Sequence, residues 1–140
     1  METKKEELVF HLSRLKKALS TLDEVLEHPF SEIVRDATIQ RFEYCFELSW
    51  KVLKKALKIE GIEVVSPRQA IRSAFEAGYL QNVDIWFEML EDRNMTSHTY
   101  DPDIANRVYE SAKRLPEEVR KIIIAIENNG GGNTPNEEKN

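Results

Sequence analysis

The chain has 140 residues, of which 41% are hydrophobic and 32% are charged, and its formal net charge at pH 7 is −5. This length and composition predict one soluble globular domain with a genuine hydrophobic core. The acidic balance argues against indiscriminate nucleic-acid binding, which usually needs a basic face. It remains compatible with a small RNA-cleaving cleft that holds a few arginines, or with docking to a basic partner.

The chain carries few signals for a membrane, a disulfide or a metal site. It contains no apolar run long enough to cross a membrane, and Met1–Lys5 lack the apolar stretch of a signal peptide, so we expect a cytoplasmic protein. The single cysteine, Cys45, excludes an intramolecular disulfide and is most simply a small buried hydrophobe. The three histidines show no metal-ligand spacing, so we expect neither a metal nor a cofactor.

Apolar residues recur with the period of an α-helix almost throughout the chain, and no stretch shows convincing strand alternation. A first long helix is predicted from the leucines Leu8, Leu12, Leu15, Leu19, Leu22 and Leu26. A second long helix is predicted from Ser31 to Ile59, with Gly61 as its stop. Its inward stripe is Ile39, Phe42, Phe46, Trp50, Leu53 and Leu57.

A short helix and a further helix follow. Ser66 to Gln69 predict a capping box with proline at the first helical position, and Gly78 closes this short helix. Asn82 is a candidate cap for the next helix, whose apolar stripe is continued by a charged residue. The stripe is Trp86, Leu90, Arg93 and Ser97. An arginine in that position indicates a cleft or an interface.

The last helix is predicted from Pro102, with Asp101 as its N-cap, to about Glu127. Pro116 lies inside this span and should kink the helix or split it. The predicted inward set is Ile104, Val108, Ala112, Leu115, Val119, Ile122, Ile123 and Ile126. The fold class is therefore all-α, an up-and-down four-helix bundle with one extra short helix over residues 1–128 and a disordered tail over 129–140.

The segment from Arg93 to Tyr100 is the strongest indication of a functional site in the sequence. Arginine offers a fork of donors suited to phosphate oxygens, and histidine transfers protons near neutral pH. In an unbroken helix, Arg93 and His98 would point roughly 140° apart. Either the helix ends or bulges between them, or an Arg and a His from two subunits meet across a two-fold axis. A structural alternative pairs Arg93 with Glu91 or Asp101 and leaves His98 as a helix cap.

Four blocks of sequence occur in order and resemble one known family. They are residues 41–51 (RFEYCFELSWK), 66–68 (SPR), 74–78 (AFEAG) and 89–100 (MLEDRNMTSHTY). Together they are similar to the HEPN superfamily, in its HepT-like branch, which is often labelled nucleotidyltransferase substrate-binding protein. The resemblance spans roughly residues 8 to 126.

The resemblance implies a homodimer with paired Arg-x4-6-His motifs in a cleft between protomers, and a separately encoded minimal nucleotidyltransferase as partner. In related toxin–antitoxin pairs the HEPN protein is a metal-independent ribonuclease that the nucleotidyltransferase neutralises. In some pairs it does so by adding AMP to the tyrosine of an Arg-x4-His-x-Tyr motif. The matching residues are Arg93 and His98 as catalytic residues, Tyr100 as the modified residue and Asn94 as the polar residue that follows the arginine.

Two further charged residues, Arg41 and Glu47, are candidates for supporting this site or contacting the partner. With Glu43 they could equally form a solvated ladder of ion pairs. Three functions remain open: an endoribonuclease toxin, a non-catalytic subunit that presents substrate to a nucleotidyltransferase, and a structural dimer. The expected dimer face includes Trp86, Leu90 and Arg93.

Overall fold

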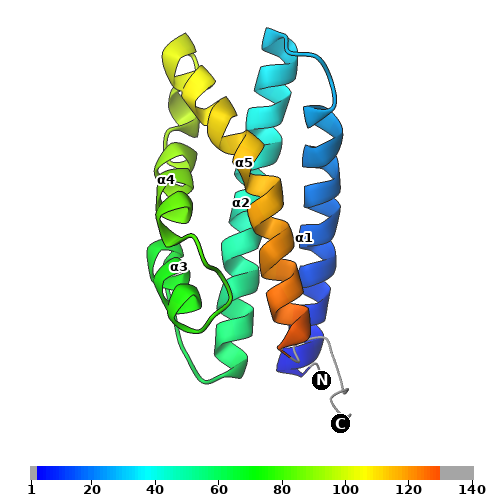
Figure 1. Cartoon of the computed structure of the whole chain (residues 1–140), viewed down its shortest axis with the longest axis vertical. Helices are drawn as coiled ribbons and strands as arrows, with labels where there is room; N and C mark the ends of the chain where they lie inside the picture. The colour runs from blue at the N-terminus through cyan, green and yellow to red at the C-terminus, as the bar shows by residue number, and fades with distance from the viewer. Residues whose placement is uncertain (1–2, 130–140) are drawn as a thin grey trace.

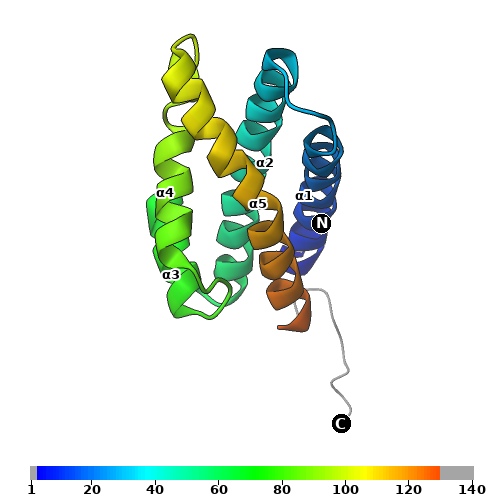
Figure 2. The ribbon, with the colours of Figure 1, turned by 45° about the horizontal axis from the view of Figure 1, so that its top comes forward.

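The computed structural model describes residues 3–129, which form α-helices and one short 3₁₀-helix with no strand in that range. The elements are α1 (Lys4–Leu26), α2 (Glu32–Ile59), α3 (Pro67–Glu76), α4 (Val83–Arg93), η1 (Thr96–His98) and α5 (Pro102–Asn128). Helices α1, α2, α4 and α5 alternate in direction along the long axis, and α3 lies on the side away from α1 (Figures 1 and 2). The predicted all-α bundle with one extra short helix is confirmed.

The helix ends follow the local chemistry of the sequence, with two differences of detail. Ser66 accepts a hydrogen bond from the amide of Gln69, as predicted, but the Gln69 side chain accepts from the amide of Val65 instead of closing a box with Ser66. Asn82 is the N-cap of α4, yet its side chain makes no capping bond. Its amide nitrogen instead lies 3.4 Å from a carboxylate oxygen of Glu118 on α5.

Two glycines stop helices where the chain needs a left-handed backbone. Gly61 after α2 and Gly78 after α3 have φ values of +84° and +89°. Residues with a Cβ rarely adopt such angles, so glycine ends both helices at little steric cost.

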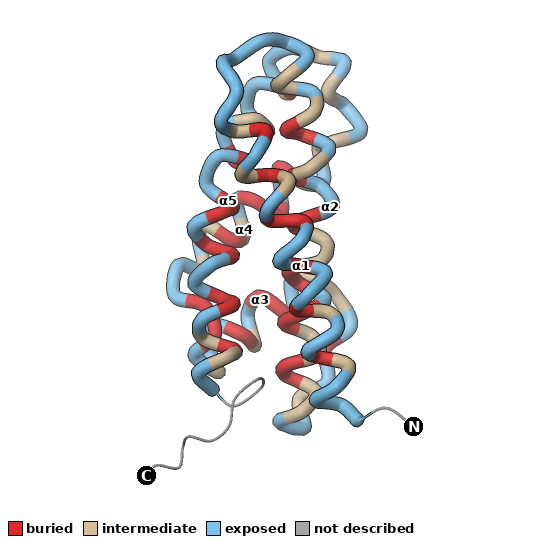
Figure 3. Tube along the Cα trace, turned by 90° about the vertical axis from the view of Figure 1, so that its right-hand side faces the viewer, coloured by how far each residue is buried: buried red, intermediate tan, exposed pale blue. Residues whose placement is uncertain are grey.

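The core is a single cluster between the helices, and the predicted apolar stripes face it (Figure 3). All six residues of the predicted α2 stripe are buried, as are all leucines of the α1 seam except the half-buried Leu26. Cys45 is completely buried, which confirms its assignment to the core. Trp86 and Leu90 are also buried within the protomer, at 0% and 5% exposure. The expectation that these two form a dimer face is therefore wrong, because their surface is already covered.

Helix α5 passes through Pro116 as one continuous helix from Pro102 to Asn128, so the predicted alternative of two separate helices is wrong. Its axis changes direction in its middle part (Figures 1 and 2), as a proline in a helix interior favours. Pro116 is itself buried, as are Leu115, Glu118 and Val119 beside it in the sequence. The predicted tail lies almost entirely outside the described residues, of which the last is Asn129, the C-cap of α5.

Candidate functional site

The break between Arg93 and His98 is a turn that joins α4 to α5. Helix α4 ends at Arg93, and the chain continues through the single 3₁₀-turn η1. The Thr96 hydroxyl donates to the Arg93 carbonyl at 2.9 Å, and the Thr99 hydroxyl donates to the Thr96 carbonyl at 3.2 Å. These hydroxyls occupy carbonyls that an ongoing helix would use for its own amides. The first of the two geometric alternatives, a helix that ends between the two residues, is therefore confirmed.

Arg93 lies against α2 rather than against its own neighbours in sequence. Its Nη2 atom is 3.3 Å from Oε1 of Glu47, and its Cζ atom lies 5.8 Å from the ring centroid of Phe46. The side chain is 23% exposed, and its Nε is buried without a hydrogen-bond partner within the described part of the chain. The alternative in which Arg93 pairs with Glu91 or Asp101 is wrong.

Two further side chains contact the Glu47 carboxylate besides Arg93. It accepts a hydrogen bond from the indole nitrogen of Trp50 at 3.1 Å, and Lys51 lies 3.8 Å from the same carboxylate oxygen. The Trp50 bond orients the carboxylate, so the other oxygen faces Arg93. The structure therefore places Glu47, a candidate supporting residue, in contact with Arg93.

His98 and Tyr100 lie on the outside of the turn. Both side chains are exposed, Tyr100 at 82%. Nδ1 of His98 is 3.4 Å from the Tyr100 hydroxyl, and the two rings meet edge to face with centroids 6.0 Å apart. A contact of that length is weak. The imidazole is thus open to solvent, and the phenol beside it is accessible to another macromolecule.

The remaining two predicted site residues lie in different settings. Asn94 forms the C-cap of α4, where its backbone amide donates to the Leu90 carbonyl. Arg41 donates to the Thr21 carbonyl at 2.7 Å and pairs with Glu24 at 3.3 Å, so it joins α2 to α1. Six residues along α2 correspond to about 9 Å between Arg41 and Glu47. Arg41 therefore makes its observed contacts away from Arg93.

A groove between α1 and α2 adjoins the same carboxylate. Its volume is about 550 Å³, and it is lined by Arg14, Lys17, Ala18, Thr21, Tyr44, Glu47 and Leu48. Two of the lining residues are joined across the helices, because the Tyr44 hydroxyl is hydrogen bonded to that of Thr21 at 2.6 Å. Glu47 thus borders both the Arg93 side chain and a groove with two cationic residues.

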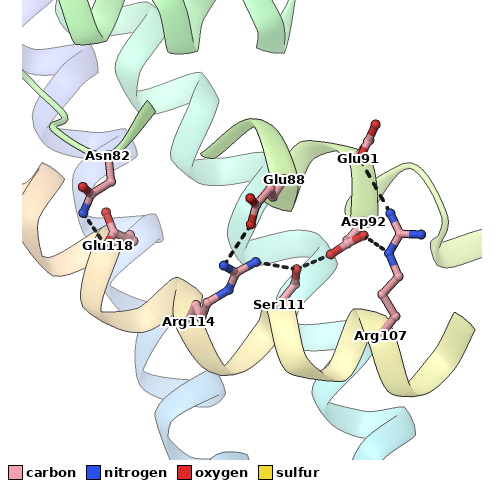
Figure 4. Close-up of polar contacts among 8 residues, drawn as sticks. All are labelled: Asn82, Glu88, Glu91, Asp92, Arg107, Ser111, Arg114 and Glu118. Atoms are coloured by element: carbon pink, nitrogen blue, oxygen red, sulfur yellow. Dashed lines mark hydrogen bonds and ion pairs between the residues drawn. The ribbon is translucent and has the colours of Figure 1, made fainter. Parts of the chain in front are cut away.

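Sequence reasoning missed one polar cluster close to Arg93. Asp92, the preceding residue, is buried and contacts Arg107 and Ser111 of α5 (Figure 4). The available signal was an acidic residue in the last turn of a helix, where the helix dipole disfavours it. Its partners on α5 could not be identified from spacing.

The described residues offer neither a metal site nor a membrane span. Within residues 3–129, no group of three or more His, Cys, Asp and Glu side chains is arranged to hold a metal ion. No helix in that range is long and apolar enough to cross a membrane.

The described chain is an antiparallel helical bundle with an Arg-x4-His-x-Tyr turn between its last two helices. A family model described as "Nucleotidyltransferase substrate binding protein like" matches residues 10–127. The chain belongs to this family.

Individual relatives agree with this assignment. A Haemophilus influenzae protein named "Probable ribonuclease HepT" is 34% identical over 76 residues, and the match spans 51% of this chain and 52% of that protein. The chain thus aligns with about half the length of this curated relative. A crystal structure of a Thermus thermophilus protein is 38% identical, with a TM-score of 0.75 over 80% of this chain and 98% of that one.

A second solved structure supports the fold alone. It comes from Haemophilus influenzae and is described as having the fold of a substrate-binding domain of a nucleotidyltransferase. It is 24% identical, with a TM-score of 0.73 over 82% of this chain and 98% of that one.

Proposed function

We propose that this protein is a metal-independent endoribonuclease, the toxin of a toxin–antitoxin pair in which a minimal nucleotidyltransferase is the antitoxin. The observation that carries the proposal is the turn after α4, where a half-buried arginine is followed by an exposed histidine and an exposed tyrosine. The name of the Haemophilus influenzae relative, a probable ribonuclease, supports the same activity.

The chemistry that fits these residues is attack of an RNA 2′-hydroxyl on its own phosphate. His98 accepts the proton of the 2′-hydroxyl, and the 2′-oxygen bonds to phosphorus. The bond from phosphorus to the 5′-oxygen breaks, that oxygen takes up a proton from water, and His98 returns its proton to the solvent. The products are a 2′,3′-cyclic phosphate and a free 5′-hydroxyl, and the reaction consumes or releases no net proton. Arg93 stabilises the negative charge that develops on the phosphate oxygens.

In the protomer, the Arg93 guanidinium is already bound to a carboxylate. Glu47 lies 3.3 Å from Nη2, and because both groups are partly exposed the ion pair is weak. A phosphate oxygen can therefore replace the carboxylate at modest cost. Glu47 keeps the arginine in one orientation until RNA binds.

We propose that two protomers form a symmetric homodimer in which their Arg93–His98 turns share a cleft. His98 is exposed in the protomer, and a partner surface would cover it and exclude water around the reacting phosphate. A two-fold interface of ordinary size buries about 1,600 Å² in total. Trp86 and Leu90 do not belong to it, because they are buried in the core.

Tyr100 is the proposed point of control by the partner enzyme. Tyr100 is 82% exposed, and its hydroxyl lies beside His98. The phenol oxygen would attack the α-phosphorus of ATP, pyrophosphate would leave, and the phenol proton would pass to solvent. The resulting AMP group is anionic and bulky, so it competes with RNA phosphate for Arg93 and blocks access to His98.

A second function is favoured by a different observation. The groove of about 550 Å³ between α1 and α2 carries Arg14 and Lys17, and it could hold an anionic substrate for presentation to the partner nucleotidyltransferase. The family description, substrate-binding protein, agrees with that role. In that case the protein would bind the nucleotidyltransferase and its substrate without cleaving RNA.

Incubation of the purified protein with RNA in EDTA separates the two functions. A ribonuclease of the proposed type leaves cyclic phosphate ends, cleaves in EDTA and leaves DNA of the same sequence intact, because DNA lacks the 2′-hydroxyl. Cleavage that EDTA abolishes would contradict the mechanism. Stable co-purification with the nucleotidyltransferase and no cleavage would favour the substrate-binding role.

A further inference from the structure

The end of α4 is bound to α5 by a buried carboxylate that lies directly before Arg93. Oδ1 of Asp92 is 2.7 Å from Nε of Arg107, and Oδ2 accepts a hydrogen bond from the hydroxyl of Ser111 (Figure 4). Asp92 and Ser111 are 6% and 1% exposed. Arg107 also reaches Glu91 at 3.6 Å, so it contacts two consecutive residues of α4.

An aspartate is an unfavourable residue for this position by local criteria. The last turn of a helix carries partial negative charge, which repels a carboxylate. Removal of the carboxylate from water adds a further cost unless charged and hydrogen-bonding partners replace the water. Arg107 and Ser111 are four residues apart on one face of α5 and supply both partners. The carboxylate therefore serves the contact between two helices and not the stability of α4.

That contact fixes both ends of the turn that carries the candidate site. The turn comprises residues 94–101, with α4 before it and α5 after it. Asp92 anchors the last turn of α4 to α5. At the other end of the turn, the Asp101 carboxylate caps the first turn of α5 by accepting a hydrogen bond of 2.9 Å from the backbone amide of Asp103. With its two ends held relative to each other, the turn has few ways to move Arg93 with respect to His98.

We propose that Asp92 is a positioning residue, whose bonds to Arg107 and Ser111 set the geometry of Arg93 and His98. This inference rests on the proposed ribonuclease activity and names the residues that preorganise its site. Catalytic groups need a tightly defined geometry, and displacement by about 1 Å costs on the order of 10²-fold in rate.

The chain contains a matched control for a test. Glu88, one helical turn before Asp92, forms an ion pair with Arg114 at 3.0 Å that also joins α4 to α5 (Figure 4). Arg114 also lies 3.4 Å from the Ser111 hydroxyl, a weak contact, so loss of the Glu88 charge leaves both direct bonds of Asp92 in place. It is exposed and lies about 6 Å further from the turn along the helix axis. Asp92→Asn and Glu88→Gln are the same carboxylate-to-amide change in the same pair of helices. Ser111→Ala is a milder second variant that leaves the ion pair with Arg107 in place.

Two measurements on the full chain test the proposal, and the first needs no activity. In hydrogen exchange, Asp92→Asn and Ser111→Ala should accelerate exchange of backbone amides in residues 93–101 and leave those of α1 unchanged, whereas Glu88→Gln should match the wild type in both regions. In RNA cleavage, Asp92→Asn should lose about 100-fold and the milder Ser111→Ala about 10-fold in kcat with KM unchanged, and Glu88→Gln should retain wild-type kinetics.

Each outcome bears on one claim. Wild-type exchange in the turn of both variants would overturn the positioning role, as would an equal kcat loss in Glu88→Gln. A wild-type protein that does not cleave RNA would refute the ribonuclease function, and the exchange comparison would still decide whether Asp92 orders the turn. Circular dichroism of each variant confirms that the bundle is folded in both measurements.

Discussion

The carboxylate of Glu47, in the middle of α2, lies 3.3 Å from the guanidinium of Arg93 at the end of α4. This ion pair joins two helices that are distant in sequence, and it occupies the cation that the proposed chemistry needs. Glu47 therefore acts on Arg93 in two ways: it orients the guanidinium, and it competes with any phosphate that approaches. These two effects oppose each other and can be separated by measurement.

Glu47→Gln should bind RNA more tightly and cleave it more slowly. Loss of the negative charge removes the competitor for Arg93. An ion pair between partly exposed groups contributes about 0.2–1 kcal/mol, so RNA affinity should rise by at most about fivefold. The rate should fall because the amide orients the guanidinium less firmly. Titration of RNA binding and single-turnover cleavage give the affinity and the rate.

Glu43→Gln is the control, since Glu43 is an exposed carboxylate on the same helix. An equal effect of both variants would show that only net charge matters.

His98→Ala should retain RNA binding and lose about 10²–10⁴-fold in cleavage rate, because general acid–base catalysis contributes that much. His98 is exposed on the outside of the turn, so the variant should fold like the wild type. His28→Ala, a change of another exposed histidine, serves as the control. Cleavage at the wild-type rate by His98→Ala would eliminate His98 as the general base.

Tyr100 should carry AMP after co-expression with the cognate nucleotidyltransferase, and cleavage should then be suppressed. The modified residue is identified by mass spectrometry of the purified protein. Tyr44 is exposed at 39%, and its hydroxyl is bonded to Thr21, so it should remain unmodified and act as an internal reference. Tyr100→Phe should escape suppression. If the partner still inhibits Tyr100→Phe fully, inhibition is by steric binding and the modification is not required.

The protein should be a dimer in solution at micromolar concentration, as the shared cleft requires. Light scattering coupled to size exclusion gives the mass directly. His98 should become less accessible in the dimer than its exposure in the protomer implies, and modification of histidines by diethyl pyrocarbonate reports on this. A monomer across the concentration range would contradict the shared cleft.

Cys45 should resist thiol reagents until the protein unfolds. Burial, with a smaller contribution from the charge of Asp23, raises the pKa of the Cys45 thiol from 9.0 to about 12. At pH 8 the native thiol is therefore protonated as well as inaccessible, and it should react with a disulfide reagent only in guanidinium chloride. The native state keeps a proton that the unfolded thiol loses. This contribution to stability is present below pH 9 and decreases as the pH rises towards 12. Rapid reaction of the native protein at pH 8 would contradict the burial.

The sequence by itself determined where the helices lie and the inward faces of α1 and α2. The leucine spacing of α1 and the aromatic stripe of α2 place their residues in the core because a helix has a fixed period and one face must avoid water. Hydroxyl residues after Arg93 and the Asp101–Pro102 pair also located the break before α5, since both act on the local backbone.

The tertiary structure decided which side chains meet across helices. It paired Arg93 with Glu47, moved the Asn82 side chain from a cap to Glu118, and enclosed Trp86 in the core where the stripe had suggested a dimer face. It also buried Asp92 against α5, at a position that local propensity disfavours. These outcomes depend on how the helices are rotated and staggered against one another. That arrangement minimises the free energy of the whole packed bundle, so the periodicity of a single helix does not contain it.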